Sequence, residues 1–532
     1  MNCLETFKKI ALSGIVASTP FYCGCGGADD PAPINVPQCA GSDCGKSGAD
    51  TTPVVPTSLC PESLDYSTEY TGGSGSGEYV KLRFDTTRKT YQMRFIESSV
   101  PASAGQINTT RAGLIVEGRF HHPTDLPTAE QNRCAFVLDD GATQNQLYQV
   151  PINRLDPPML FVGNGVVGGG IPGATIQFDG IPVQPGVNLG AVPARTFDFF
   201  PFIGFTDTET DFAKIAGRYN EVGLHLTPTG TTYQTAMPQG WQPDVVNWTE
   251  LFNPDGSCTA ATDSDYSCRT TGTPWTLRQR SDGSRDNVFV SHAQPNQPYP
   301  LAGQGQPLVL SIPSQAMGIM IAGKLNGTLV PIVIRVGYAY ADQHNPLGSV
   351  ADPEVGISLL SPATRIESGA LKGGYVGATS ASACGVVTFD GNSGAPAQSG
   401  SSFDGRKPHP NLPGRYDGTF FLPDAGGCTD GSAVSTIAAN YTSTLFQGTT
   451  AAFIDPQTSA ETALFSLDYG QADPGKIGIT ASSDFAAKDS NGAVSIIRRG
   501  DTGWIVSIGN VYAMVMNDSK VNPFFTVGAF VQ

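Results

Sequence analysis

Short stretches of alternating apolar and polar residues recur along the chain. In residues 77–84 (GEYVKLRF) and 90–97 (TYQMRFIE), apolar side chains alternate with charged or amide side chains, and the intervening residues 85–89 (DTTRK) are typical of a turn. A period of two is the signature of a β-strand with one buried face. The pattern therefore predicts a β-hairpin over residues 77–97.

A second hairpin is predicted around Asn326-Gly327. These two residues separate the apolar runs 317–325 (MGIMIAGKL) and 328–340 (TLVPIVIRVGYAY). Asn-Gly is a favoured pair for a two-residue turn between antiparallel strands. Pro331 has no backbone N–H to donate, so we expect the second strand to lie at a sheet edge or to contain a bulge.

Capped helical patterns are scarce. The brief candidate 210–217 (TDFAKIAG), with Thr210 as its N-cap, ends at Gly217. Strand-like runs return at 503–518 and 523–532. A β-propeller would show a regular period of about 40–50 residues, and none is present. We therefore predict an all-β fold of antiparallel barrel-like or sandwich sheets.

A short motif with glycine two residues before an aromatic residue occurs four times, as VEGRF (116–120), IAGRY (215–219), LKGGY (371–375) and LPGRY (412–416). Glycine at such positions lets a strand bend or another backbone approach. The two pairs of motifs predict two related β modules, 61–292 and 307–532, joined by the polar linker 293–306.

The N-terminal residues resemble a bacterial signal peptide. Lys8 and Lys9 precede a 13-residue apolar stretch, 10–22, which is too short to span a bilayer as a helix. Cys25 follows a small glycine and precedes residues rich in Gly, Pro and Asp, as at a lipoprotein processing site. We predict a signal peptide over 1–24, lipid on Cys25, and a disordered tether over 25–60. The alternatives are processing at Cys23, which the bulky Tyr22 before it disfavours, and simple secretion after cleavage by another peptidase.

The cysteine count agrees with export. Once Cys3 and Cys23 leave with the signal peptide and Cys25 takes lipid, an even number remains, which predicts up to four disulfides in an oxidising compartment. The easiest pairings to propose are Cys258 with Cys268 and Cys384 with Cys428. The connectivity stays open among the eight remaining cysteines: Cys39, Cys44, Cys60, Cys134, Cys258, Cys268, Cys384 and Cys428.

Charge and composition restrict the function classes. The formal net charge is -16 and basic residues form no long stripe, which excludes nucleic acid as the expected partner. The six histidines and the cysteines have no metal-ligand spacing. We therefore expect no metal and no cofactor, and membrane contact through the N-terminal lipid.

One short string resembles the nucleophile segment of chymotrypsin-like serine peptidases. Residues 391–396 read Gly-Asn-Ser-Gly-Ala-Pro, with Ser393 in the place of the nucleophile. His292 at the end of a strand-like run and Asp342 or Asp352 follow the order His, Asp, Ser. The same string is also ordinary turn chemistry, so the hydrolase is kept as an alternative function.

Aromatic residues gather in two places. Trp241 and Trp248 offer a surface on which a sugar could stack, although packing in a core or loop is the commoner role. Residues 195–205 (RTFDFFPFIGF) are so aromatic that we expect them in the core.

Three strings, GEYVKLRF (77–84), FAKIAGRYNEVG (212–223) and MGIMIAGKL (317–325), together with the signal sequence, resemble a family of uncharacterised exported proteins of proteobacteria, often described as lipoproteins. The resemblance implies an envelope location and no activity. Our first hypothesis is a non-enzymatic binding or structural module at the outer membrane, with an unidentified protein or glycan ligand. The alternatives are an exported serine hydrolase using Ser393 and an outer-membrane β-barrel.

Overall fold

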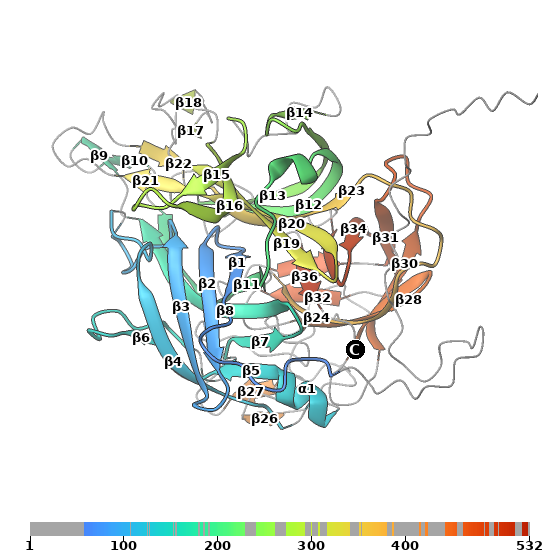
Figure 1. Cartoon of the computed structure of the whole chain (residues 1–532), viewed down its shortest axis with the longest axis horizontal. Helices are drawn as coiled ribbons and strands as arrows, with labels where there is room; N and C mark the ends of the chain where they lie inside the picture. Colours follow the sequence, from blue (N-terminus) through green and yellow to red (C-terminus); the bar gives the residue numbers. More distant parts are fainter. Residues whose placement is uncertain are drawn as a thin grey trace, which may run out of the picture. The chain divides into compact units, whose positions relative to one another are not determined.

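The computed structural model describes residues 58–529 with gaps, of which the longest are 229–240, 261–272, 388–413 and 424–441. In this part of the chain almost all regular structure is β-strand (Figure 1). The predicted all-β class is confirmed, and the main strands form two closed barrels and one open sheet.

The first barrel is built from residues 70–205. Its strands follow the ring order β3-β2-β1-β11-β8-β7-β5-β4, and the ring closes because β4 also pairs with β3. The short β6 pairs with β4. In chain order these strands are β1 (Tyr70–Ser74), β2 (Tyr79–Asp85), β3 (Thr90–Glu97), β4 (Ile115–His121), β5 (Ala135–Leu138), β6 (Ala142–Thr143), β7 (Met159–Val162), β8 (Val166–Phe178) and β11 (Val192–Phe205).

The open sheet follows in the sequence. Its order is β14-β13-β12-β23-β20-β19-β16-β15, with antiparallel pairing throughout. Its strands are β12 (Gly217–Pro228), β13 (Trp241–Phe252), β14 (Cys258–Ala260), β15 (Thr276–Gln279), β16 (Arg285–His292), β19 (Met317–Leu325), β20 (Thr328–Val336) and β23 (Val355–Pro362).

The second barrel is closed by the pairing of its first and last strands, β24 and β36. Its strands are β24 (Lys372–Thr379), β28 (Thr442–Gln447), β29 (Thr450–Ile454), β30 (Glu461–Asp468), β31 (Ile477–Ala481), β34 (Thr502–Ile508), β35 (Val511–Met516) and β36 (Phe524–Ala529).

Small ribbons and two short helical segments complete the described structure. The helix α1 (Ala129–Cys134) lies in the first barrel's chain, and η1 (Phe212–Lys214) is a 3-10 turn. Neither of these described helices is long and apolar enough to cross a bilayer. The ribbons are β9 (Ile181–Gln184) with β10 (Val187–Leu189), β17 (Tyr299–Pro300) with β18 (Pro307–Leu308), β21 (Tyr338–Tyr340) with β22 (Val350–Asp352), β25 (Val386–Val387) with β32 (Phe485–Lys488) and β33 (Val494–Ile497), and β26 (Gly414–Tyr416) with β27 (Phe421–Pro423).

The first predicted hairpin is confirmed as β2 and β3, but β2 is buried on both faces. Alternate residues such as Leu82 fill the barrel, as the pattern predicts. The other face packs against the open sheet, where the ammonium of Lys81 lies 3.4 Å from the carboxylate of Asp286. Arg278 also pairs with Asp286, at 2.9 Å. Charged residues on β2 therefore mark an internal contact between barrel and sheet.

The Asn326-Gly327 turn is confirmed, with φ of 50° and 81° at its two residues. The expectation for Pro331 was wrong, because β20 lies between β19 and β23 and its pairing with β19 shows no bulge. The pairing of β20 with β23 begins one residue later, at Ile332. The missing N–H of Pro331 therefore falls just outside that ladder.

The candidate helix at 210–217 is reduced to the single turn η1. Its N-cap is Asp211, whose carboxylate accepts a hydrogen bond from the N–H of Ala213, and not Thr210 as predicted. A glycine follows within a few residues, so no longer helix forms.

Each barrel is filled by its own side chains. The first contains stacked and edge-to-face aromatic rings, among them Phe84, Phe120 and Phe136, and the second contains Tyr375 and Tyr512. A third apolar cluster includes residues from both barrels and the open sheet. The described phenylalanines of 195–205 are buried, as expected.

The predicted division into modules 61–292 and 307–532 stays a prediction. The strand β16 precedes the linker 293–306 and β19 follows it, and these two strands pair with each other in the open sheet. The sheets themselves therefore group the strands as barrel, sheet and barrel.

Candidate functional site

The helix α1 begins with a capping box at one end of the first barrel. The hydroxyl of Thr128 accepts a hydrogen bond from the N–H of Gln131 at 3.1 Å, and the amide oxygen of Gln131 accepts one from the N–H of Thr128 at 3.0 Å. Glu130 in the first turn and Arg133 in the last turn complement the helix dipole. These features hold a six-residue helix that would otherwise be marginal.

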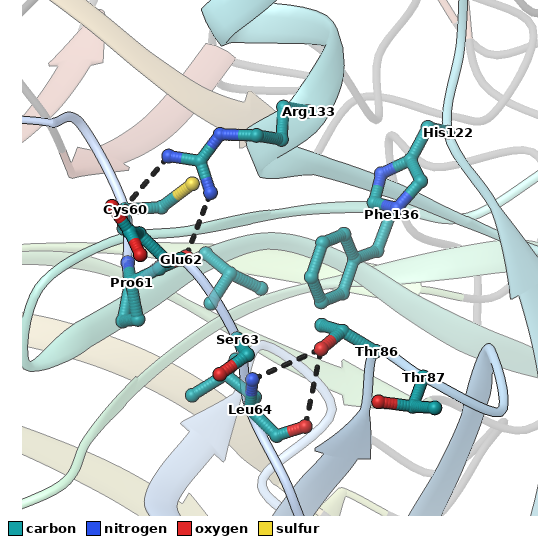
Figure 2. Close-up of a pocket in the computed structure, with 11 residues that line it drawn as sticks. Cys60, Pro61, Glu62, Ser63, Leu64, Thr86, Thr87, His122, Arg133 and Phe136 are labelled. Carbon is teal, nitrogen blue, oxygen red and sulfur yellow. Dashed lines mark hydrogen bonds between the residues drawn. The ribbon is translucent and has the colours of Figure 1, made fainter.

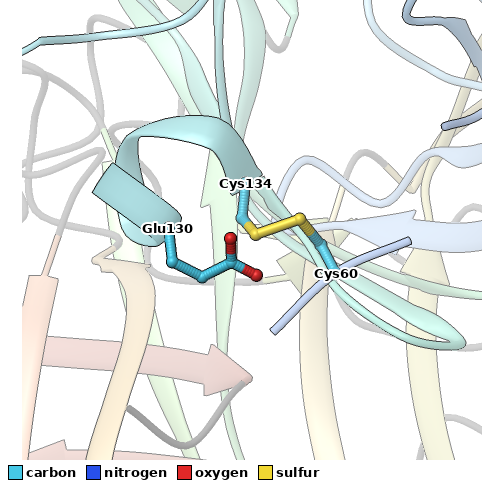
Figure 3. Close-up of side chains that lie close together, drawn as sticks. All are labelled: Cys60, Glu130 and Cys134. Atoms are coloured by element: carbon cyan, nitrogen blue, oxygen red, sulfur yellow. A yellow bond between two sulfur atoms is a disulfide. The ribbon is translucent and has the colours of Figure 1, made fainter. Parts of the chain in front are cut away.

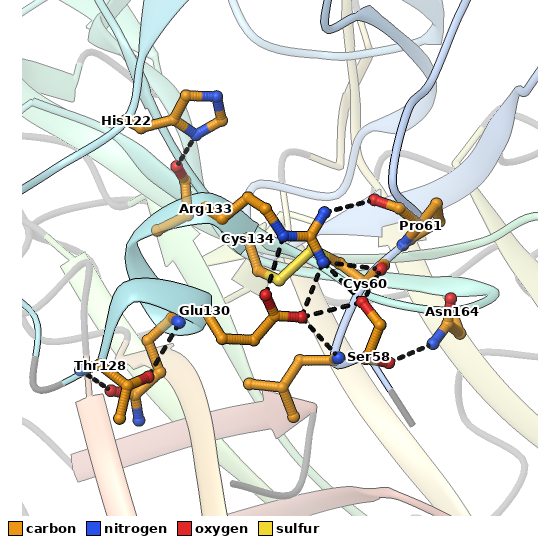
Figure 4. The surroundings of a disulfide bond; sticks show 12 residues. Ser58, Cys60, Pro61, His122, Thr128, Glu130, Arg133, Cys134 and Asn164 are labelled. Atoms are coloured by element: carbon orange, nitrogen blue, oxygen red, sulfur yellow. Dashed lines mark hydrogen bonds and ion pairs between the residues drawn. A yellow bond between two sulfur atoms is a disulfide. The ribbon is translucent and has the colours of Figure 1, made fainter. Parts of the chain in front are cut away.

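The helix fastens the segment that leads into the first barrel. A disulfide joins Cys60 to Cys134, the last residue of α1 (Figure 4). The guanidinium of Arg133 donates to the carbonyl oxygens of Cys60 at 3.0 Å and Pro61 at 2.8 Å. Residues 58–61 pair with none of the described strands, and side chains of α1 hold this segment in place of a strand ladder.

Glu130 completes this arrangement, which we call the clamp: Ser58, Leu59, Cys60, Pro61, Glu130, Arg133 and Cys134. Its carboxylate accepts hydrogen bonds from the hydroxyl of Ser58 at 2.8 Å and from the N–H of Leu59 at 3.0 Å. It also accepts two from Arg133, at 2.7 and 2.8 Å. The hydrogen bond from Arg133 lowers the pKa of Glu130 to about 2 although burial opposes this. Glu130 is therefore ionised at neutral pH.

Cys60, Cys134 and Glu130 lie close enough together to resemble a set of metal ligands (Figure 3). The two sulfurs are bonded to each other, and cysteine binds metals as the thiolate. Glu130 is held by four hydrogen bonds within the clamp. We therefore assign these three residues to fastening the chain.

A cavity of about 290 Å³ lies between the clamp and the end of the barrel (Figure 2). Its wall combines the segment 60–64, the β2–β3 turn, the end of β4, the start of β5 and the end of β7. The apolar part of the lining comes from Leu64, Phe136 and Val162, and the polar part from Glu62, Ser63, Thr86, Thr87, His122 and Arg133.

Several of the polar groups are already engaged. Each of the three guanidinium nitrogens of Arg133 donates within the clamp. The hydroxyl of Thr86 accepts a hydrogen bond from the N–H of Leu64 and donates one to its carbonyl oxygen. His122 donates from Nδ1 to the carbonyl oxygen of Ala135 at 3.1 Å. Burial lowers the pKa of His122, so its imidazole is uncharged at neutral pH.

Among the residues that the structure describes, three polar groups have no hydrogen-bond partner: the hydroxyls of Ser63 and Thr87 and the carboxylate of Glu62, whose charge acts on Arg133. All three side chains are exposed. The cavity thus offers a small apolar floor and a rim of groups that can form new hydrogen bonds.

Residues 90–529 match the family described as "Protein of unknown function (DUF2957)". The chain belongs to this family. DUF2957 membership confirms the expected resemblance to proteins without an assigned activity, while a proteobacterial source and export stay predictions. No curated protein matches the chain.

Solved structures similar to this DUF2957 chain include intact Ap-TbpB with its N and C lobes, at 7% identity and a TM-score of 0.20, covering 85% of this chain and 66% of that one. A mutant of the vaccine antigen Transferrin Binding Protein B from Haemophilus parasuis Hp5 also matches, at 7% identity and a TM-score of 0.19, covering 85% and 65%. The chain thus spans slightly less than two thirds of the length of each.

The residues of the hydrolase hypothesis are placed only in part. His292 is the exposed last residue of β16, and its backbone N–H donates to the hydroxyl of Thr273 at 3.0 Å. Ser393 and Asp342 lie outside the described residues. Their arrangement with His292 stays a prediction.

Among the predicted cysteine sites, Cys258 is described. It begins β14 and is disulfide-bonded to a cysteine outside the described part of the chain. Cys268, Cys384 and Cys428 also lie outside it, as does the lipidation candidate Cys25. The predicted pairings are therefore open.

The clamp itself was not predicted. One signal was visible, because Thr128-Ala-Glu-Gln131 has the Thr-x-x-Gln spacing of a capping box. The disulfide between Cys60 and Cys134 could not be singled out, since eight cysteines allow 105 pairings.

Proposed function

We propose that the chain is a non-enzymatic binding module, attached to the bacterial cell envelope through lipid on Cys25, that holds a small ligand at the end of its first barrel. The cavity of about 290 Å³ carries this proposal. Its size is near the lower end of the range for small-molecule sites, about 300–1,000 Å³. Barrel interiors packed with side chains leave their ends as places for a ligand.

The clamp favours binding because it fixes the cavity wall before a ligand arrives. Residues 60–64 form part of that wall, and Cys60 is covalently linked to Cys134. A wall ordered in advance does not lose conformational entropy on binding, which improves affinity.

The ionisable groups favour binding over acid–base chemistry. A general acid or base works best with a pKa near the working pH. The pKa of Glu130 is about 2, held down mainly by the hydrogen bond from Arg133. The pKa of His122 lies below its ordinary value because of burial. Glu130 is therefore too acidic for this role at neutral pH, and burial moves the pKa of His122 away from neutral pH.

The outward face of β4 favours a water-exposed barrel over a membrane-spanning one. Glu117, Arg119 and His121 are exposed on it, and Arg119 pairs with Asp140 at 2.6 Å. A strand facing lipid would carry apolar residues at these positions.

Attachment to the envelope is tested by intact-mass analysis of the N-terminal peptide from membrane fractions, with Cys25→Ala as the comparison. We expect a diacylglyceryl mass on Cys25 and its loss, with release of the protein, in the variant. An unlipidated N-terminus in the soluble fraction would refute the anchor.

Binding is tested with a mixture of neutral, cationic and anionic small fragments observed by ligand-detected NMR. Thr87→Trp places a large side chain at the cavity, while Thr109→Trp makes the same exchange in an exposed loop beyond the other end of β3. We expect fragment signals in the wild type and Thr109→Trp, and their loss in Thr87→Trp. Equal signals from both variants would rule out this cavity as the binding site.

A further inference from the structure

We propose that the cavity at the end of the first barrel recognises a small, uncharged polyhydroxylated molecule of about the size of one sugar ring. This inference rests on the binding function proposed above and names the ligand class of the same site. The argument comes from the volume of the cavity and from the hydrogen-bonding groups that its lining leaves unused.

The volume limits the ligand to a single small ring. The volume of about 290 Å³ lies just below the range of small-molecule sites, about 300–1,000 Å³. A monosaccharide with its hydroxyls is of this size class, whereas a disaccharide or a peptide would extend beyond the cavity.

The charges disfavour an anion. Among the described lining residues, Arg133 alone has a permanent positive charge, and all three of its guanidinium nitrogens already donate within the clamp. Glu130 neutralises it directly, at 2.7 Å. The uncharged imidazole of His122 adds no attraction. Among the described lining residues, a phosphate or carboxylate would find no available cation, and Glu62 would repel it; the charge of Lys89 in the adjoining β2–β3 turn acts on His122 but comes from outside the lining.

A cation is also poorly matched. The carboxylate of Glu62 is exposed, so water screens its attraction for a ligand ammonium. Glu62 already interacts with the charge of Arg133, whose pKa is raised by hydrogen bonds and by the nearby carboxylates although burial opposes the shift. The guanidinium would in turn repel a second cation.

A polyol matches what remains. The hydroxyls of Ser63 and Thr87 can each donate and accept, and the carboxylate of Glu62 accepts two or more hydrogen bonds. Ligand hydroxyls have the same dual capacity. The C–H face of a sugar ring would lie against the apolar groups of Leu64, Phe136 and Val162.

The test uses the full mature chain and saturation-transfer NMR with glucose, galactose, mannose and N-acetylglucosamine as probes. We expect at least one sugar to bind, and Thr87→Val, which removes one hydroxyl at nearly constant shape, to weaken it about fivefold, the effect of one lost hydrogen bond. Ser63→Ala should act in the same direction. Thr109→Val, the matched exchange beyond the other end of β3, should leave the affinity unchanged.

Two further probes separate failure of the ligand class from failure of the binding function. If ethylammonium or inorganic phosphate binds, the sugars do not, and Thr87→Trp abolishes the binding, the polyol class is wrong while the cavity remains a binding site. If none of the probes gives a signal that Thr87→Trp removes, both proposals fail. Sugar binding that is equally strong in Thr87→Val and wild type would place the sugar elsewhere.

Discussion

Removing the clamp's disulfide should destabilise the first barrel and open its end. The bond links residues 74 positions apart. By closing this long loop, it reduces the number of conformations that the unfolded chain can adopt. For a loop of this length, chain-entropy theory gives about 4.5 kcal/mol, and measured values for comparable bonds are about 2–4 kcal/mol. We expect Cys60→Ala/Cys134→Ala to lower the free energy of unfolding of the first barrel by about 2–4 kcal/mol.

The assay is urea denaturation monitored by hydrogen exchange with mass spectrometry. A chain of several sheets need not unfold in one step, and peptides from each barrel report the stability of that barrel separately. Substitution is preferable to a reducing agent, since Cys258 is also in a disulfide. Exchange should rise first at the amides of Leu59 and Leu64, whose N–H groups are bonded to Glu130 and Thr86. Unchanged stability of the first barrel, or an equal loss in the second, would refute the reasoning.

Three further results are expected. Glu130→Gln should lower the free energy of unfolding by about 1 kcal/mol at pH 6, after allowance for solvent screening. The pKa of Glu130 is about 2 in the folded protein and ordinarily 4.5, so this advantage of the wild type should fade as the pH falls from 4.5 to 2. Urea midpoints measured across that pH range would detect the loss. Asp286→Asn should remove the buried carboxylate that Lys81 and Arg278 share. Because Glu69 and Glu97 still pair with these two cations, the cost should be about 1–3 kcal/mol, seen as faster proteolysis between barrel and sheet. Gly118→Ala places a Cβ 2.0 Å from the carbonyl oxygen of Asp140 and should lower the thermal midpoint, for a cost of about 1–3 kcal/mol.

The fold class was predictable because period-two patterns act locally. The hairpins at 77–97 and around Asn326-Gly327 form where alternation and turn residues predicted them. What the alternation could not indicate was a second buried face. On β2 the polar positions include Lys81, which is 5% exposed; its ammonium lies 3.3 Å from Glu69 and 3.4 Å from Asp286, which belongs to a strand about 200 residues later. A local pattern contains no information about such a distant partner.

Pro331 also shows that a local pattern does not reveal the neighbouring strands. Its missing N–H correctly excludes one hydrogen bond, but the sequence does not reveal how far the neighbouring strand extends. Here the ladder with β23 begins at Ile332, so an internal strand tolerates the proline. At a sheet edge and beyond the end of a strand ladder alike, a backbone N–H has no neighbouring strand to bond. Only the pairing register distinguishes the two cases.

The candidate site depends on non-local partners to a greater degree than the fold does. Its wall joins a segment before β1 to a helix about 70 residues later through Cys60, Arg133 and Cys134. Each of these residues, taken alone, is an ordinary cysteine or surface arginine. Their function arises because the capping box at Thr128 starts α1 where Arg133 and Cys134 both reach the incoming chain. Local capping signals therefore predict where a helix begins, while the cavity follows only once the barrel has closed and brought its end against that helix.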